Sequence, residues 1–352
     1  MAFFGSVEAV LGSSVSSLAK VEGIGEKTAE KIFKSKTSFD VEKELAIADK
    51  FGVCVIDITD DRYPPALKKI YDPPPVLYIK GDFQPCDSLS IAIVGSRHCS
   101  NYGTEQASRF AHLLAAAGFT IVSGMARGID SAAHNGALSA KGRTIAVQGC
   151  GLSNIFPPEN KALFEKICQN GACVSELPME YEPLAENFPP RNRIIAGLSI
   201  ATIVVEAMPK SGALITAQTA LESNREVMAI PGKIDSPLSK GPHKLIKQGA
   251  KLVESVEDVL EALEFLNIDF AQHVRQTADK EIEKQKELFD TSKLNLTETE
   301  RKILDCLDSE PVHIEEIISE TELSAGKVNA TLVSMRLKGI VKQLPGNYFT
   351  KR

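Results

Sequence analysis

The sequence predicts an α/β protein whose main domain is a doubly wound parallel sheet of an extended, Rossmann-like type. Short apolar runs rich in β-branched residues recur between residues 91 and 230, and most of them end in glycine or another small residue. A helical pattern separates most neighbouring runs. This alternation is typical of parallel strands that are covered by helices on both faces.

The apolar runs give the expected strands. Six belong to the core: Ile91–Val94, Thr120–Ser123, Thr144–Gln148, Cys173–Glu176, Ala201–Val205 and Val227–Ile230. Two earlier runs, Val53–Ile58 and Val76–Ile79, are expected to extend the sheet, with a proline-rich segment between them that excludes a helix. Residues Tyr102–Ala117 carry an apolar stripe at helical spacing, which predicts a helix that packs on the sheet.

Composition divides the chain into four parts. Residues 1–52 are expected to form a helical helix–hairpin–helix (SAM-like) module, residues 53–266 the core, and residues 297–352 a winged helix. Residues 267–296 are charged and lack glycine, which indicates a solvated linker or a loose helix. In the first module, Gly23 and Gly25 permit a tight turn that can face a DNA phosphate with Lys27 and Lys31 nearby; the same module can also serve packing alone.

Bulk properties restrict the class of protein. The net charge of −6 argues against a uniformly basic surface, so any nucleic-acid site must be a local positive patch. The 7 cysteines show no CxxC pair and no zinc spacing, which fits a reducing cytoplasm and predicts no metal site. We expect no signal peptide and no membrane span, because the N-terminal residues and the apolar runs lack the required patterns.

A strand followed by a small, polar turn places backbone N–H groups and a helix N-terminus at one edge of the sheet, where phosphate binds well. Gly95, Ser96 and Arg97 follow the first core strand in this way. Glycine permits close approach of an anion, serine donates a hydrogen bond, and arginine offers a bidentate pair. The alternative is a structural turn in which Arg97 pairs with a carboxylate.

The second turn, SGMARGIDSAAH, differs from the GxGxxG dinucleotide pattern. Gly124 and Gly128 are expected to make the turn, and Asp130 is expected to cap the following helix. No acidic residue for a ribose follows at the usual spacing, which disfavours a dehydrogenase. His134 is expected to pack or to bond within its helix rather than to act as a base.

Two later segments add candidate contacts for a nucleic-acid strand. Phe188, Arg191, Asn192 and Arg193 combine a ring for base stacking with charges for phosphates, and we expect at least one of the two arginines to be structural. Lys210, Ser211 and Gly212 begin another helix and form a further anion site. Glu206 alone, without a paired base or nucleophile, is weak support for catalysis.

These glycine turns, together with FPPRNRIIAGLS, SGALITAQTALE and AIPGKIDSPLSKGPHKLIKQGA in this order, resemble the family of DNA-processing protein A (DprA, also called Smf). The resemblance extends over nearly the whole chain. It implies sequence-independent binding and protection of single-stranded DNA, loading of the recombinase RecA in natural transformation, a homodimer, no cofactor and no catalytic turnover. The residues that it places at the DNA are Gly95, Ser96, Arg97, Gly124, Phe188, Arg191, Asn192, Arg193, Lys210, Ser211 and Gly212. It places His243, Ile246 and Leu252 at the dimer face.

The chain departs from the family at three places. Pro157 and Pro158 stand where some relatives carry a lysine, and Ala185 and Glu186 stand where some carry a basic residue. Ala213 replaces a common serine. Because affinity for a polyanion scales with the phosphates neutralised, we expect weaker or more salt-sensitive DNA binding than in more basic relatives.

Two other functions are compatible with parts of the sequence. A Rossmann-type nucleoside monophosphate phosphoribohydrolase of the lysine-decarboxylase-like family shares the strand–glycine–helix pattern, but its PGGxGT turn reads PKSGALIT here and lacks the catalytic acid. Alternatively, the winged helix carries the DNA contact, through Lys327 and Arg336 in a duplex groove.

Overall fold

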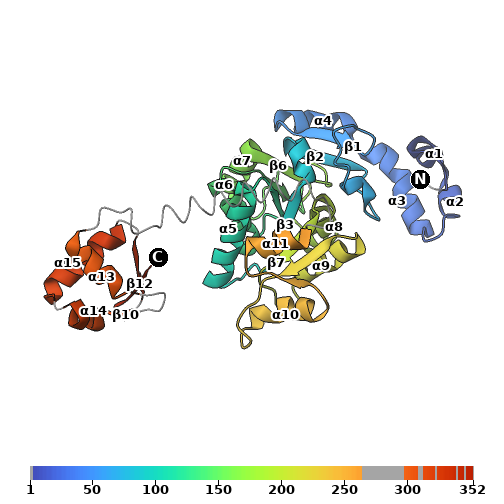
Figure 1. Cartoon of the computed structure of the whole chain (residues 1–352). Coiled ribbons are helices and arrows are strands. Elements are labelled where there is room, and N and C mark those ends of the chain that lie inside the picture. The colour runs from blue at the N-terminus through green and yellow to red at the C-terminus, as the bar shows by residue number, and fades with distance from the viewer. Residues whose placement is uncertain are drawn as a thin grey trace. The chain divides into compact units, whose positions relative to one another are not determined.

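The computed structural model describes residues 3–263, 297–307, 312–321, 323–337, 340–344 and 346–351. The chain forms two compact units, Met1–Ala278 and Asp279–Arg352 (Figure 1), and each has its own hydrophobic core. The predicted linker, residues 267–296, lies outside the described residues, and the boundary expected after residue 52 stays a prediction.

A nine-stranded sheet organises the described part of the larger unit, in the order β1-β2-β6-β5-β4-β3-β7-β8-β9. Its strands are β1 (Cys54–Asp57), β2 (Val76–Gly81), β3 (Ser90–Val94), β4 (Thr120–Ser123), β5 (Thr144–Val147), β6 (Gly171–Ser175), β7 (Ala201–Val204), β8 (Glu226–Ala229) and β9 (Lys251–Leu252). The strands β3 to β9 pair in parallel, whereas β1 and β2 pair antiparallel with each other, and β2 pairs antiparallel with β6. The predicted fold class is confirmed, and the strand ends shift from their expected positions by no more than two residues.

Helices cover both faces of this sheet. They are α4 (Val41–Lys50), α5 (Asn101–Ala116), α6 (Ile129–Ser139), α7 (Lys161–Asn170), α8 (Phe188–Leu198), α9 (Gly212–Glu222), α10 (Lys240–Lys247) and α11 (Val256–Leu263). Alternate residues of a strand point to opposite faces, and β3 shows the result. Ile91 and Ile93 pack with α5, α6 and α11, while Ala92 and Val94 pack with α8 and α9.

The order of the strands creates a switch point at β3. From β3 the chain proceeds through β4 and β5 to β6 on one side, and it returns to the other side of β3 with β7 and β8. In open α/β sheets, ligands bind outside the carboxyl ends of strands at such a point. The loops that follow β3 and β7 therefore mark the first place to look for a site.

A buried ion pair fastens the segment before β3 to the sheet. Asp87 accepts hydrogen bonds from Arg143 Nε and Nη2, both at 2.9 Å, and from Thr120 Oγ1 at 2.7 Å. The backbone N–H of Gln84 donates a fourth bond at 2.8 Å. Since Asp87 is 8% exposed, these contacts replace nearly all of its water.

The N-terminal residues form short helices around the predicted hairpin. They are α1 (Val7–Gly12), α2 (Val15–Leu18) and α3 (Glu26–Ser38). Gly23, with φ of +84°, and Gly25 connect α2 with α3, and Lys27 and Lys31 are exposed on α3. The left-handed backbone at Gly23 explains the need for glycine there.

The smaller unit has the predicted winged-helix fold. Its described helices are α13 (Glu298–Asp305), α14 (Ile314–Thr321) and α15 (Ala325–Leu337), and its strands β10 (Val312–His313), β11 (Val341–Leu344) and β12 (Tyr348–Lys351) pair in the order β10-β12-β11. Lys327 and Arg336 are both exposed on α15, and Arg336 donates to Gln343 Oε1 at 2.6 Å.

Candidate nucleic-acid interface

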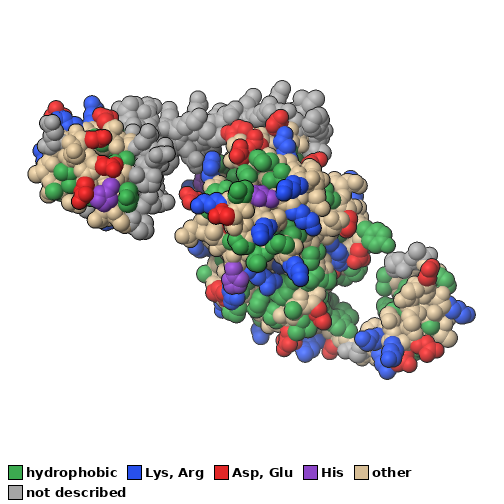
Figure 2. Space-filling model, turned by 90° about the horizontal axis from the view of Figure 1, so that it is seen from below, with side chains coloured by type: hydrophobic (Ala, Val, Ile, Leu, Met, Phe, Trp, Pro, Cys, Tyr) green, Lys and Arg blue, Asp and Glu red, His purple; other side chains and the backbone are tan. Residues whose placement is uncertain are grey.

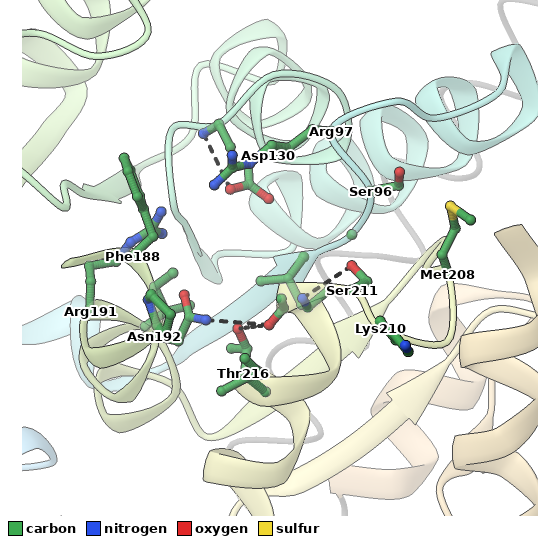
Figure 3. A pocket seen from close by; sticks show the side chains of 18 of the residues that line it. Ser96, Arg97, Asp130, Phe188, Arg191, Asn192, Met208, Lys210, Ser211 and Thr216 are labelled. Carbon is green, nitrogen blue, oxygen red and sulfur yellow. Dashed lines mark hydrogen bonds between the residues drawn. The ribbon is translucent and has the colours of Figure 1, made fainter. Parts of the chain in front are cut away.

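A cavity of about 670 Å³ opens beyond the carboxyl ends of β3 and β7. Four segments line it: the loop after β3, the turn between β4 and α6, the start of α8, and the loop from β7 into α9 (Figure 3). Of the predicted DNA-contact residues, it brings together Gly95, Ser96, Arg97, Phe188, Arg191, Asn192, Lys210, Ser211 and Gly212. Figure 2 shows basic and apolar side chains interleaved over the middle of one face of the larger unit, with acidic side chains mainly toward its margins.

The loop after β3 is held tightly and presents Arg97 to the solvent. A Cβ at Gly95 would lie 2.5 Å from Ile129 Cγ1 and 2.9 Å from the carbonyl oxygen of Glu206, so this position requires glycine. The Ser96 hydroxyl donates a hydrogen bond to the carbonyl of His98 at 2.9 Å. Its proton is therefore already used and is not available for the phosphate contact that we expected. Arg97 is exposed, and its guanidinium carbon lies 5.2 Å from the centroid of the Phe188 ring. The alternative pairing of Arg97 with a carboxylate is not found among the described ion pairs.

Glu206 has a structural role. Its carboxylate accepts hydrogen bonds from the backbone N–H and the hydroxyl of Ser100, at 2.8 and 2.6 Å. The same hydroxyl caps α5 by accepting from Gly103 N at 3.1 Å. Glu206 is 4% exposed and belongs to the support of the loop rather than to the lining of the cavity.

Two buried ionisable side chains, which form no ion pair in the described structure, lie on the floor of the cavity. Arg191 and Asp130 are 4% and 7% exposed, and both line the cavity. Burial lowers the pKa of Arg191 to about 10, and burial also raises the pKa of Asp130, although the charge of Arg191 opposes that rise. The Nε of Arg191 has no hydrogen-bond partner in the described structure. The guanidinium therefore keeps unused hydrogen-bonding capacity, which a bound anion can satisfy.

Two predicted contacts lie outside this lining. Gly124 sits behind Arg191, where a Cβ would lie 1.6 Å from Arg191 Nη1, so its role is to make room for the guanidinium. Arg193 is held by Glu176, with both Nη atoms 2.6 Å from the carboxylate oxygens, and by Asp72 at 3.2 Å. Arg193 is thus the structural member of the arginine pair.

The N-terminus of α9 completes the cavity opposite the arginines (Figure 3). Ser211 is its N-cap and accepts from Ala213 N at 3.3 Å. Asn192 Nδ2 donates to the carbonyl of Gly212 at 3.3 Å and so connects α8 with α9. The exposed end of this helix adds partial positive charge beside Lys210, which favours an anion.

The sequence did not point to several apolar and acidic residues of the lining. Met208 and Ile215 are 52% and 45% exposed at its edge, and Ile195 forms part of its wall. Asp130 was expected to cap α6, but Gly128 is the N-cap, with φ of +74°, and Asp130 lies in the first turn. For Ile195 the sequence offered a signal, because positions 188, 191, 192 and 195 share one face of a helix.

The expected dimer residues lie near the β9 end of the sheet. His243 Nε2 accepts from Gly232 N at 3.3 Å, and Ile246 is half-buried against the core. Leu252, on the outermost strand β9, is 41% exposed. A dimer through these residues stays a prediction.

His134 is a neutral, buried histidine. Thr144 Oγ1 donates to the carbonyl of Ile121, so His134 Nδ1 donates to Thr144 Oγ1 at 2.7 Å, and Nε2 is left without a partner. Burial, reinforced by the charge of Arg191, lowers the pKa of His134 to about 3 from the ordinary value of 6.5. The bond to Thr144 crosses to β5, outside its own helix.

This lowered pKa predicts acid destabilisation. The stability that neutral His134 contributes is complete above the unfolded pKa and is lost as the pH falls from there toward about 3. We expect the free energy of unfolding of the wild type, relative to His134→Gln, to fall by about 1.4 kcal/mol per pH unit in that window. Urea unfolding of the wild type and of His134→Gln at several pH values measures this difference. Asp130, whose raised pKa has the opposite effect on stability, is present in both proteins, so its contribution cancels. A difference that does not change with pH would contradict the assignment.

The described residues contain no cluster of His, Cys, Asp or Glu that is placed to hold a metal ion. Within the same residues, no helix has both the length and the apolar character needed to cross a membrane.

Comparison with known proteins gives consistent matches. Residues 54–264 match the family of DNA recombination-mediator protein A, and residues 289–347 match the DprA winged helix domain. Protein Smf of Synechocystis is 37% identical over 95% of this chain and 89% of its own length. DNA processing protein DprA of Bacillus subtilis is 43% identical over 65% of this chain and 77% of its own.

Two solved structures are similar in fold and sequence. DNA processing protein A from Streptococcus pneumoniae has 39% identity and a TM-score of 0.61, and the match covers 71% of this chain and 86% of that one. DNA processing protein A from Helicobacter pylori, described for its single-stranded DNA binding mode, has 30% identity and a TM-score of 0.54 over 60% of this chain and 95% of that one.

Proposed function

The chain belongs to the DNA recombination-mediator protein A family, and from this premise we propose that it binds and protects single-stranded DNA without sequence preference, in the cavity at the ends of β3 and β7. The observation that carries the proposal is the meeting of nine predicted DNA-contact residues from three separate segments in this one cavity. The relative from Helicobacter pylori, described for its single-stranded DNA binding mode, supports the choice of ligand.

The cavity offers each component that base-independent binding requires. Arg97 and Arg191 supply positive charge, and the N-terminus of α9 supplies backbone N–H groups for phosphate. Phe188, with both guanidinium groups within 6 Å of its ring centroid, supplies a surface on which a base can stack. None of these contacts reads the edge of a base, so the binding is indifferent to sequence.

The wider role is binding rather than turnover. We propose that the protein acts in the cytoplasm as a homodimer through His243, Ile246 and Leu252, and that it loads RecA onto incoming DNA in natural transformation. A dimer presents two cavities to one strand and raises the effective concentration of the second contact. The phosphoribohydrolase alternative receives no support from Glu206, whose carboxylate is buried and engaged with Ser100.

Binding of a labelled oligothymidine by the full chain tests this function. We expect binding that persists against excess duplex competitor, and no release of adenine from adenosine monophosphate. The double variant Lys327→Ala, Arg336→Ala is the control for the winged helix, and we expect it to bind as the wild type does. Equal competition by duplex, or loss of binding in the double variant, would contradict the proposal.

A further inference from the structure

One side chain of the cavity opposes the ligand proposed above. Asp130 is a carboxylate in the lining of a cavity that otherwise presents Arg97, Arg191 and a helix N-terminus (Figure 3). A surface that only attracted phosphate would gain nothing from an anion at this place. Its position on the floor beside Arg191 calls for a separate explanation.

Asp130 is fixed by the turn that carries it. Its Oδ2 accepts from the backbone N–H of Ala126 at 3.3 Å, and it lies in the first turn of α6, two residues after the left-handed Gly128. This hydrogen bond holds the carboxylate at the floor of the cavity. The carboxylate therefore remains within reach of any phosphate that approaches Arg191.

Arg191 explains why the carboxylate is present in the free protein. A guanidinium with 4% exposure has lost most of its water, and a buried charge without compensation is strongly unfavourable. Asp130 shares the cavity lining with Arg191 and its charge favours the ionised guanidinium, although the two side chains form no described ion pair and Arg191 Nε lacks a partner. The hydrogen-bonding capacity of Arg191 thus stays incomplete in the free protein.

We propose that Asp130 is the counter-charge of the binding cavity: it balances Arg191 in the free protein, repels the phosphate of a bound strand, and takes up a proton when the strand binds. This inference rests on the proposed function. Binding of single-stranded DNA is consequently linked to protons and becomes tighter as the pH falls. Asp130 is a positioning and affinity-setting residue, since it acts through Arg191 and through the net charge of the cavity.

Other groups face Asp130 or its partner and must be separated from it. They are Arg191 of α8, Arg97 and His98 of the loop after β3, His134 of α6, and Cys150 of the loop after β5. Arg191, with a pKa of about 10, stays charged over the useful range. His134 and Cys150 stay neutral there, because burial lowers the pKa of His134 to about 3 and raises that of Cys150 to about 11. His98 lines the same cavity, so a His98 variant serves as the control.

The test compares the full-length wild type, Asp130→Asn and His98→Gln. Asparagine keeps an oxygen that can accept from Ala126 N but carries no charge. Oligothymidine affinity is measured by fluorescence anisotropy between about pH 8 and 5.5 and over a range of salt, and proton uptake is measured by titration calorimetry in two buffers of different ionisation enthalpy.

We expect Asp130→Asn to bind about tenfold more tightly than the wild type at the upper pH, because a like charge has been removed from beside the phosphate. The wild type gains affinity as the pH falls and takes up protons on binding. The variant loses this proton uptake, while His98→Gln retains it. The slope of log affinity against log salt concentration becomes steeper by up to about 0.7 in Asp130→Asn. This change corresponds to one additional phosphate contact on a single strand.

Two results would overturn the inference while leaving the proposed function intact: a folded Asp130→Asn that binds no more tightly than the wild type, or a wild type that binds without proton uptake. The second result needs no variant, so it decides the matter even if Asp130→Asn fails to fold. Proton uptake that disappears in His98→Gln would assign the proton to His98 and also overturn the inference. A wild type that does not bind oligothymidine would overturn both proposals.

Discussion

Replacing Arg97 by alanine is expected to weaken oligothymidine binding by about 1.5–3 kcal/mol, the usual contribution of a hydrogen bond to a charged group. Arg97 is exposed at the cavity, above the ring of Phe188, and has no carboxylate partner among the described ion pairs. Its charge is therefore available to a phosphate rather than used within the fold. Fluorescence anisotropy with the full chain measures the loss.

Arg193→Ala is the matched control for this prediction. It removes the same charge from the same unit of the chain, but Arg193 is held by Glu176 and Asp72 and lies outside the cavity. We expect Arg193→Ala to lower stability, as seen by circular dichroism on heating, and to leave the affinity of the folded protein unchanged. Equal losses of affinity in both variants would mean that general charge, and not the cavity, governs binding.

The largest loss of stability is expected for Asp87→Ala. Removal of this carboxylate leaves the guanidinium of Arg143 without its bidentate partner and leaves Thr120 Oγ1 and Gln84 N without an acceptor. Breaking a buried ion pair from one side costs about 3–5 kcal/mol, because an uncompensated charge stays in place. Urea unfolding followed by circular dichroism suits this chain, which contains no tryptophan.

Asp82→Ala provides the comparison on the same arginine. Asp82 lies 3.8 Å from Arg143 Nη1, and its side chain is 62% exposed, whereas the side chain of Asp87 is 6% exposed. An exposed pair of this kind contributes about 0–1 kcal/mol. If Asp87→Ala cost no more than Asp82→Ala, burial of the Arg143–Asp87 pair would not have the energetic importance assigned to it.

The sheet could be predicted because its signal is local. Most of the predicted strands are apolar runs that end near glycine or another small residue, as Ile121 and Val122 before Gly124 illustrate. Parallel strands that are buried on both faces have this pattern. Strand order could not be derived from these runs. The return of the chain to the other side of β3, which creates the switch point, depends on packing between distant segments.

The site was predictable in its residue types and less so in their geometry. Arg191 and Arg193 are equivalent in composition, but residues two apart on a helix point in nearly opposite directions, so one reaches the cavity and the other reaches Glu176. Asp130 was misassigned because an acidic residue near a helix start usually caps it. Gly128 is the N-cap instead, because its backbone is left-handed. The sequence does not show which glycine adopts this conformation.

The central claim is that an unpaired DNA strand occupies the cavity between the loops after β3 and β7. Photochemical cross-linking of an oligothymidine that contains iododeoxyuridine, followed by mass-spectrometric mapping on the full chain, tests it most directly. The account predicts adducts on the cavity lining, foremost on Phe188, and their loss in competition with unlabelled oligothymidine. Adducts confined to α3 or α15, with none on the cavity lining, would contradict it.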